Sequence, residues 1–594
     1  MKRLQGFIGG LLNKKVDATG LAIFRIFYSV ILLCEVGQIF YFKELIFDKI
    51  PFIESADIDL SYALIVWMFS LVLIVFGLFT RTATVLNYAF SIVFIATIKS
   101  YEYHMFYIYM GVNFLLMFVR VERCLSLDNL RLFLKKPEAN EDKSGSAFDY
   151  YIIAFVGIGL VYLDSVFYKW DSYYWLKGLG LWLPASFTNL TIFDTSWLLN
   201  AKWLVLGLGY LTLMFETVFI FLLHKPKLRV PLLIIGMGLH LGIIIEFPIP
   251  WFGLGVSALY LLLVPQKWWR ILGGFLGLSK QKLTVHSIPQ KPIENLVGVV
   301  SFCGNVRVLP DVTLGKGDLV ITDLSGIEYK GRSALYKLIR CNPLCYLIFL
   351  IFKFIAPSLT EQWVSSILTD SISYGIHSSR GLDLKRYLDA LNVRLTSSIF
   401  LLVVLLQINV TLKSDLINRA SENIGLGSNI FGSSVAGFSN RVANISKKFF
   451  GITRHTVFLD PHFEGYNHTT AVEAVLPNGE KEWLPFISEN GHVGNYNYSF
   501  IWAKWTFRVM APSVNMNNYE KGIRDVTTFW AGKNGYRYSE ITYNLYYKGL
   551  NVPVKWEKDF LRSQYEVPWT KFGEAKWEEN QFVLEAKDIE SLTY

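Results

Sequence analysis

Residues 230–245 read VPLLIIGMGLHLGIII, a run without a single charged side chain. A helix needs about 20 mainly apolar residues to cross a bilayer core, and segments near this length recur along the chain. Eight of them precede residue 265 and a ninth stands alone after a long interval, at 21–41, 63–79, 83–98, 105–119, 150–167, 203–223, 230–245, 251–264 and 398–412. The sequence therefore predicts a polytopic α-helical membrane protein with about eight spans plus a ninth.

The composition agrees with a membrane protein. Of the 594 residues, 52% are hydrophobic and only 18% are charged, which excludes an ordinary soluble globular protein. The net charge of +9 is spread through the loops beside the predicted spans instead of forming one basic face. We therefore expect these charges to orient the protein and to contact anionic lipid, and we expect no nucleic-acid partner.

Lysine and arginine in short loops orient a membrane protein because they are retained on the cytoplasmic side. Here they gather before the first span, after the fourth, between the sixth and seventh, and after the eighth, at Lys2, Arg3, Lys14, Lys15, Arg120, Arg123, Arg131, Lys135, Lys136, Lys225, Lys227, Arg229, Lys267 and Arg270. The pattern predicts a multi-pass protein of a bacterial inner membrane with a cytoplasmic N-terminus. Residues 1–16 lack the features of a cleavable signal peptide.

The order of the spans predicts four parts of the chain. A transmembrane domain covers residues 1–265, a small cytoplasmic α/β domain covers 266–396, the ninth helix covers 397–413, and a β-rich extracytoplasmic domain covers 414–594. All five cysteines precede residue 414, so the outer domain requires no disulfide framework.

Lys169 ends the stretch LVYLDSVFYK, residues 160–169, at the end of a predicted span. A charge at this place has three explanations: it snorkels to water, it pairs with an acid from another helix, or it acts chemically. A desolvated amine loses basicity toward neutrality and can then accept a proton. Asp164 lies five residues earlier, about 500° around the helix, and is expected to point away from Lys169, whereas Tyr162 shares its face.

Several short motifs in the first 265 residues resemble the horizontally transferred transmembrane (HTTM) domain, which bacterial proteins share with the vitamin K-dependent gamma-carboxylase. These motifs are Phe24-Arg25 in the first span, Leu125-Ser126-Leu127-Asp128 after the fourth, Lys169 followed by Trp175 and Gly178, and Gly238-Leu239-His240 in the seventh. Their order and spacing relative to the spans extend the resemblance over about residues 15–265.

In the carboxylase, the lysine of a Val-Tyr-x-x-x-Gly-x-x-Lys pattern is the base that deprotonates reduced vitamin K. Val161-Tyr162 to Lys169 reproduces this spacing, although Ser165 and Val166 stand where a small residue and glycine are expected. The resemblance implies a site in which a reduced quinone is contacted by Tyr162 and Trp175 and the catalytic residues are Lys169, His240 and His104.

Other polar residues in the spans have a structural explanation beside the functional one. A single histidine within a span, such as His240, is often a hydrogen-bonded core residue, and the glycines around it let helices approach closely or leave room for a ligand. Three charges inside spans are expected to pair as clasps between helices: Arg25, Glu35 and Glu216.

The interval 285–390 alternates short strands, such as residues 319–322, with apolar helices. Its segments 329–335 and 374–380 resemble the tail of the DCC thiol-oxidoreductase family, which has a thioredoxin-like fold. That family uses an Asp-x-x-Cys-x-x-Cys motif for disulfide exchange, whereas this chain has only Cys303-Gly304 at that place. We therefore predict a degenerate domain. The apolar run 344–356 is expected to pack on the membrane or inside this domain.

The region after residue 425 is rich in Tyr, Trp, Asn and Gly, and alternating residues at 470–476 precede Pro477-Asn478-Gly479. Alternation before such a turn predicts a hairpin, and a second turn is expected at Lys533-Asn534-Gly535. The aromatic surface of this β-rich domain is expected to bind an extracytoplasmic protein, peptide or glycan.

Four potential ligands for a divalent metal fall between residues 455 and 468, namely His455, Asp460, His462 and His468. Histidine and carboxylate are natural zinc ligands, and their proximity allows convergence on one turn. Their spacing matches no standard metal motif, so an ordinary polar loop is the alternative.

Two functions follow from these patterns. The first is an enzyme with Lys169 as the base of a quinol- and oxygen-dependent carboxylation, epoxidation or related oxygenation. The second is a non-catalytic membrane scaffold that carries a degenerate redox module and a partner-binding domain. A transporter is less favoured, because neither an inverted repeat nor a pair of broken helices is visible.

Overall fold

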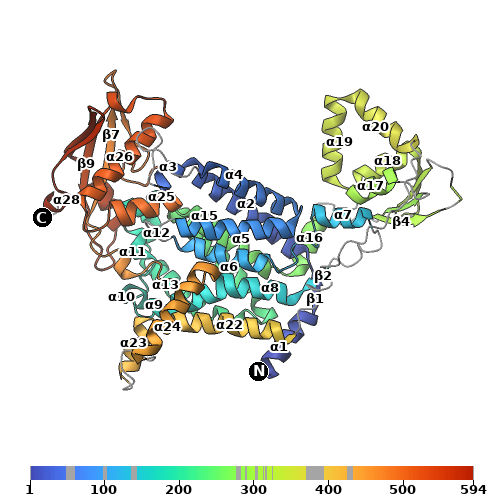
Figure 1. Ribbon diagram of the computed structural model, residues 1–594, viewed down its shortest axis with the longest axis horizontal. Helices are drawn as coiled ribbons and strands as arrows, with labels where there is room; N and C mark the ends of the chain where they lie inside the picture. Colours follow the sequence, from blue (N-terminus) through green and yellow to red (C-terminus); the bar gives the residue numbers. More distant parts are fainter. Residues whose placement is uncertain are drawn as a thin grey trace.

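The computed structural model describes residues 2–47, 60–97, 103–135, 144–275, 283–287, 291–300, 306–311, 313–314, 318–323, 325–369, 393–423 and 432–592. A helical bundle forms the middle of the molecule (Figure 1). A small α/β module lies at one end, beside α7 (Leu127–Lys135) and α16 (Gln266–Phe275), and a β-rich domain lies at the other end.

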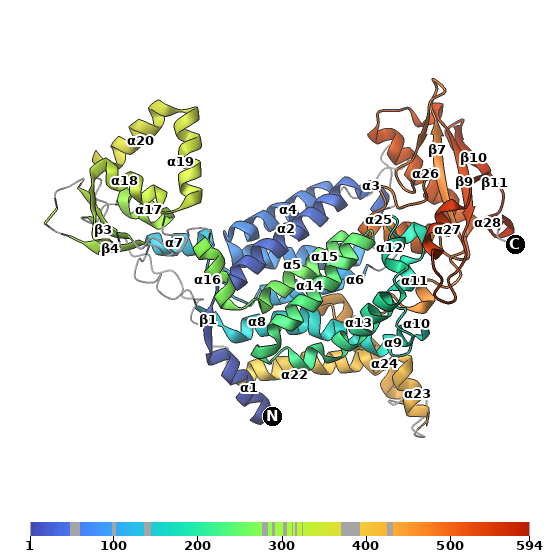
Figure 2. The ribbon, with the colours of Figure 1, turned by 180° about the vertical axis from the view of Figure 1, so that it is seen from behind.

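The long apolar helices of the bundle lie roughly side by side (Figures 1 and 2). Four helices are long and apolar enough to cross a membrane, namely α2 (Thr19–Tyr41), the helix Ala147–Lys169, α13 (Lys202–Leu222) and the helix Pro226–Glu246 that contains α14 (Arg229–Glu246). A fifth candidate is the pair Leu395–Thr411 and Asp415–Asn423, bent by 75°, which belongs to α22 (Val393–Thr411) and α23 (Asp415–Asn423). The protein is therefore a helical membrane protein.

The remaining predicted spans fall on shorter or less apolar helices. They are α4 (Ser61–Phe76), α5 (Thr80–Thr97), α6 (His104–Leu116) and the helix Pro250–Leu263, which begins with α15 (Pro250–Tyr260). Length and composition thus support four or five spans within the described residues, and the count of nine stays a prediction.

Arg25 and Asp128, two residues of the HTTM-like motifs, hold helix ends together. The buried Arg25 guanidinium donates to the carbonyl oxygen of Val121 over 3.0 Å, so this clasp uses a carbonyl instead of an acid. Asp128 accepts hydrogen bonds of 2.8 Å from the backbone N–H and the hydroxyl of Thr80, where α5 begins. Glu35 is buried in α2 without an ion-pair partner among the described residues.

The α/β module contains a four-stranded sheet in the order β4-β3-β5-β6, formed by β3 (Leu283–Ser287), β4 (Val306–Pro310), β5 (Leu319–Thr322) and β6 (Glu328–Lys330). The strands β3 and β4 are parallel and connected through α17 (Lys291–Val300), whereas β5 runs antiparallel to β3 and to β6. The helices α18 (Gly331–Arg340), α19 (Pro343–Ile355) and α20 (Pro357–Thr369) follow. Cys303 and residues 374–380 lie outside the described residues.

The C-terminal domain is built on an antiparallel sheet in the order β11-β10-β9-β7-β8. Its strands are β7 (His468–Val475), β8 (Lys481–Trp483), β9 (Thr542–Gly549), β10 (Thr570–Glu578) and β11 (Gln581–Ala586), and the helix α26 (Met516–Lys533) lies beside them (Figure 2). Residues 477–479 join β7 to β8, as predicted. The second predicted turn is present at Asn534 and Gly535, with Gly535 in the left-handed region at φ +74°, but it ends α26 instead of joining two strands.

The segment between α23 and the sheet returns to the bundle. The helix α24 (Gly432–Ile445) and the turn Ser446–Phe450 pack against α22, α5 and α6. The Tyr88 hydroxyl donates to the carbonyl of Phe449 over 2.6 Å, and the Ser439 hydroxyl donates to the Asn409 side chain over 2.6 Å. The predicted boundary at residue 414 therefore precedes a segment that packs on the bundle, and the sheet domain follows Gly451.

Candidate functional site

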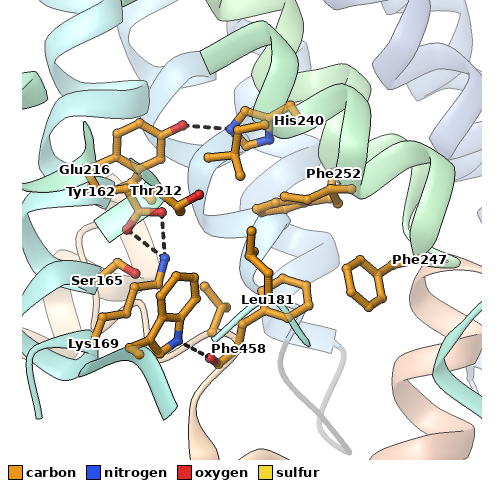
Figure 3. Close-up of a pocket in the computed structure, with 15 residues that line it drawn as sticks. Tyr162, Ser165, Lys169, Leu181, Thr212, Glu216, His240, Phe247, Phe252 and Phe458 are labelled. Carbon is orange, nitrogen blue, oxygen red and sulfur yellow. Dashed lines mark hydrogen bonds and ion pairs between the residues drawn. The ribbon is translucent and has the colours of Figure 1, made fainter. Parts of the chain in front are cut away.

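Lys169 and Glu216 form a buried ion pair between two neighbouring helices. Lys169 ends α9 (Leu160–Lys169), the last part of the helix Ala147–Lys169, and Glu216 lies in α13. The ammonium nitrogen is 2.6 and 2.7 Å from the two carboxylate oxygens, and each side chain is only 5% exposed (Figure 3). This burial excludes snorkelling for Lys169. The pairing with an acid from another helix is observed, and removing one partner of such a pair costs about 3–5 kcal/mol.

Trp175 covers the ammonium on the side toward the C-terminal domain. It lies in α10 (Tyr173–Leu176), whose first turn is capped by the Ser172 hydroxyl. The Lys169 nitrogen is 4.5 Å from the centre of the Trp175 ring, a distance that allows a cation–π contact. The indole N–H donates to the carbonyl of Phe458 over 2.7 Å, so the ring also joins the bundle to the C-terminal domain.

Gly178 lets the chain turn beside α13 after Trp175. Its φ is +74°, and a Cβ added there would lie 2.8 Å from the Tyr210 ring. A side chain at this position would therefore be strained by the backbone and by the neighbour. This glycine of the HTTM-like motif is thus needed for the backbone turn beside α13.

Tyr162, His240 and Tyr260 form a hydrogen-bonded chain on the other side of the Lys169–Glu216 ion pair. The Tyr162 hydroxyl is 2.7 Å from His240 Nε2 and 2.8 Å from the Tyr260 hydroxyl. His240 is buried, and its Nδ1 has no hydrogen-bond partner within the described part of the chain. Gly236 makes room for Tyr260, because a Cβ there would lie 2.1 Å from the tyrosine ring.

Tyr162, Lys169, Trp175, Glu216 and His240 line a cavity of about 50 Å³ (Figure 3). Space of this size holds a few water molecules. Polar groups of Lys169, Glu216 and His240 meet at one side, and the other walls are mainly apolar and aromatic, formed by Leu181, Ile243, Phe247, Phe252, Val457 and Phe458. Residues 457 and 458 come from the segment that leads into the C-terminal domain, so that segment closes one wall of the site.

Asp164 faces away from Lys169, as the helical rotation predicts. One carboxylate oxygen accepts hydrogen bonds from the Gln407 side chain, over 3.1 Å, and from the Thr411 hydroxyl, over 2.7 Å, both on α22. The other oxygen accepts the backbone N–H of His455 over 2.7 Å. Asp164 therefore connects three segments that are far apart in the sequence.

The structure brings together four of the predicted site residues, Tyr162, Lys169, Trp175 and His240. His104 is not among the residues that line the cavity. It begins α6 and lies beside His455, with 5.9 Å between the ring centres. The proposed catalytic role of His104 in the same site therefore has no support from its position.

The predicted metal ligands are held by different neighbours. The Ser172 hydroxyl donates to the Asp460 carboxylate, and the backbone N–H of Tyr174 donates to it over 3.4 Å. His462 accepts the backbone N–H of Leu459 at Nδ1 over 3.3 Å. Burial lowers the pKa of the His462 imidazole.

His455 and His468, the first and last of the four predicted metal ligands, have different neighbours again. His455 sits against Asp164 and His104, whereas His468 lies on β7 and its Nδ1 donates to the Asn467 side chain over 2.9 Å. No group of three or more His, Cys, Asp or Glu in the described ranges is placed to hold a metal ion. The structure therefore does not assemble the predicted metal site.

Two lining residues, Val457 and Phe458, and Tyr260, which contacts the lining residue Tyr162, were missed from the sequence. Val457 and Phe458 lie almost 300 residues beyond Lys169 and carry no motif. Tyr260 had a signal, because a hydroxyl within an apolar segment needs a hydrogen-bond partner. Glu216 was recognised as an unusual charge, but nothing in the spacing paired it with Lys169.

The bundle and its cavity define an integral membrane protein with a buried lysine–glutamate site. The family model described as HTTM domain matches residues 13–268, a range that holds Lys169, Glu216 and His240. This part of the chain is therefore an HTTM domain, the membrane domain found in vitamin K-dependent carboxylase-like proteins. No curated protein and no solved structure matches the chain.

Proposed function

We propose that the HTTM domain is an enzyme in which Lys169 removes a proton from a hydroxyl group of a hydrophobic molecule, with a reduced quinone as the first candidate. The reaction that follows is oxygen-dependent, such as a carboxylation or an epoxidation. One observation carries the proposal: a buried Lys169–Glu216 pair forms the polar side of an otherwise apolar cavity. A membrane-soluble molecule with one polar end would place that end at the ion pair and its apolar part against the other walls.

Glu216 gives Lys169 a way to become a base without contact with water. Burial disfavours both charges of the pair, so passing one proton from the ammonium to the carboxylate leaves two neutral groups. The neutral Nζ of Lys169 then accepts a proton from the bound hydroxyl, and the new ammonium stabilises the oxygen anion. Trp175 keeps solvent from the amine throughout.

His240 offers a second polar contact at the same cavity. Because its Nε2 is engaged by Tyr162, its Nδ1 is the nitrogen left for a bound molecule. We propose that His240 orients the substrate and that Tyr162 fixes the histidine.

The polar groups of Lys169, Glu216 and His240 suit an aromatic hydroxyl, but the cavity is too small for a bicyclic ring. About 50 Å³ is far smaller than such a ring, so the substrate enters only when a wall retracts. We assign this movement to Val457 and Phe458, because they come from the segment that leads into the C-terminal domain, whereas the other lining residues belong to the bundle.

The second candidate function is a non-catalytic scaffold. It is favoured by the complete pairing of Lys169 and by the small cavity. The order of the sheet β4-β3-β5-β6, with β3 and β4 parallel and the other pairs antiparallel, supports a thioredoxin-like module that has lost its second cysteine. In that case the C-terminal domain carries the function by binding a partner.

We further propose that the protein lies in a bacterial inner membrane with its N-terminus and α/β module in the cytoplasm. The positions of lysine and arginine between the spans support this orientation. The C-terminal domain would then meet a protein or peptide partner outside the cytoplasm.

Oxygen consumption with a reduced naphthoquinone tests the enzyme proposal. The purified wild type is compared in one detergent with the double variant Lys169→Met/Glu216→Met, which removes both charges together and so leaves no single buried charge. Lys177→Met, at an exposed lysine of the same region, is the matched control. We expect the double variant to lose about a hundredfold or more of the activity and the control to keep it. Equal background rates in all three proteins would contradict the proposal and favour the scaffold.

A further inference from the structure

The hairpin of α19 and α20 exposes a continuous apolar stripe. On α19, Ile348, Ile351, Phe352 and Ile355 are 55, 47, 62 and 74% exposed. Their spacing of i, i+3, i+4 and i+7 places them on one face of the helix. Domains in water rarely leave such a face uncovered, and large exposed apolar patches mark contact with a membrane or a partner.

The stripe is separate from the core of the α/β module. Phe349, about 100° around α19 from Ile348, is only 8% exposed and packs against Tyr336 and Trp363. The stripe also continues around the tip of the hairpin, where Phe354 and Leu359 are 90 and 65% exposed. This helix is thus apolar on two sides, of which the module covers one.

The placement of α19 indicates what covers the other side. The chain enters the module from the bundle through α16 and returns to it through α22, so the module is held at the membrane. Figures 1 and 2 show α19 on the side of the module that faces the bundle, running across the direction of the long bundle helices. A helix so placed lies parallel to the membrane plane at the end of the bundle.

The helix α16, at the same end of the bundle, also exposes an apolar face. Trp268, Ile271 and Leu272, again spaced i, i+3 and i+4, are 43, 58 and 44% exposed. The same helix carries the cations Lys267 and Arg270. Apolar side chains together with cations and tryptophan are typical of helices that lie in the headgroup region of a bilayer.

We propose that the α19–α20 hairpin is an in-plane membrane anchor, with the stripe Ile348, Ile351, Phe352 and Ile355 buried among the lipids of the leaflet on the module's side. The anchor fixes the module against the bilayer beside the bundle, with its sheet away from the lipid. This inference does not depend on the proposed activity of Lys169.

Photocrosslinking tests the anchor in the full chain. p-Benzoylphenylalanine replaces Phe352 in one variant and Lys330, an exposed residue on β6 of the same module, in the control. Both proteins are reconstituted into vesicles of phosphatidylethanolamine and phosphatidylglycerol, illuminated and digested, and the adducts are identified by mass spectrometry.

We expect a lipid adduct at residue 352 that exceeds the adduct at residue 330 by about tenfold or more. An adduct to another polypeptide at residue 352 would overturn the proposal and identify the stripe as a protein interface. Equal lipid labelling at both positions, or none at either, would overturn it as well. Both replaced side chains are exposed, and an unchanged far-ultraviolet circular dichroism spectrum confirms that both variants are folded.

Discussion

At the scale of single residues, the pairing of Lys169 with Glu216 makes the effect of mutations strongly non-additive. Replacing either one by methionine leaves the other charge buried and unpaired, and we expect a loss of about 3–5 kcal/mol in the free energy of unfolding. The double variant removes both charges and is expected to lie within about 1–2 kcal/mol of the wild type. Unfolding of the bundle in one detergent, followed by near-ultraviolet circular dichroism, measures the difference. A double variant as unstable as the sum of the two single variants would contradict the pairing.

His468 predicts how the C-terminal domain responds to acid. Burial lowers the pKa of this imidazole from 6.5 to about 4. The unfolded chain therefore binds a proton that the folded domain rejects, and stability is lost as the pH falls from about 6.5 to about 4. The loss is on the order of 3 kcal/mol, at 1.36 kcal/mol for each pKa unit.

The variant His468→Gln isolates this effect. Glutamine keeps a donor for Asn467 and does not titrate, so the slope of stability against pH in this window is expected to flatten. Denaturant unfolding at a series of pH values provides the measurement. An unchanged slope would show that other groups control the acid response.

Single site residues can be predicted from the sequence where burying that kind of side chain at that position costs free energy. Lys169 and Glu216 stand out because charges within apolar segments require partners, and the resemblance added Tyr162, Trp175 and His240. The four predicted metal ligands failed, because closeness along the chain does not decide which way side chains point. Phe458 could not be found, since an ordinary phenylalanine gives no signal before folding brings it to Trp175.

At the scale of elements, Asp164 is the polar link between α9, α22 and the segment at His455, beside the apolar contact of Phe400 on α22 with Phe155. The change Asp164→Ala removes the acceptor for Thr411, Gln407 and the His455 backbone at once, and we expect it to cost about 2–4 kcal/mol. Thr411→Val removes one donor and is expected to cost about 1 kcal/mol.

Limited proteolysis in detergent distinguishes these two changes. Cleavage between α22 and Gly451 should be much faster in Asp164→Ala than in Thr411→Val, because three contacts are lost instead of one. Equal and slow cleavage in both variants would contradict the role of Asp164 as the link.

The sequence predicts elements from periodicity and length, and each predicted span falls on a helix. Periodicity does not decide the spanning status of α4 and α6, because these apolar helices have fewer than 18 residues. The predicted turn at residues 533–535 is present but follows a helix, because glycine after asparagine ends helices as well as joining strands. The return of α24 and the turn Ser446–Phe450 to the bundle has no sequence signal, since it depends on the contacts of α24 with α22 and of the turn with α5 and α6.

At the scale of the whole molecule, the C-terminal domain closes the site in the bundle. Asp460 accepts from Ser172 at the start of α10, and Phe458 accepts from Trp175. We expect Asp460→Ala to loosen this junction, so that backbone amides of residues 455–462 and of α10 exchange hydrogen faster.

Hydrogen exchange followed by mass spectrometry measures this loosening, with Glu464→Ala as a control at an exposed acid of the same segment. Faster exchange confined to Asp460→Ala is the expected result. Identical exchange in both variants would show that the domain is held by its other contacts, such as the one between Asn200 and Asp559.

The general architecture follows from composition, since charge and apolar length divide the chain into membrane and non-membrane parts. How the parts join cannot be predicted from composition, because the side chains that connect the bundle to the C-terminal domain belong to no sequence motif. The site is thus partly predictable: Tyr162, Lys169, Trp175 and His240 were identified from the sequence, whereas the apolar walls and the closing segment at Val457 and Phe458 were not.

The central claim is that Lys169 accepts a proton from a hydroxyl group bound in the cavity, and a chromogenic naphthol tests it without assuming the substrate. The absorbance of such a probe changes when its hydroxyl loses a proton, so the ionised fraction of bound probe is measured at a pH where the free probe is neutral. We expect ionisation of the probe by the wild type and by Lys177→Met, and none by Lys169→Met/Glu216→Met. A probe that binds but stays neutral in the wild type, or ionises equally in the double variant, would contradict the account.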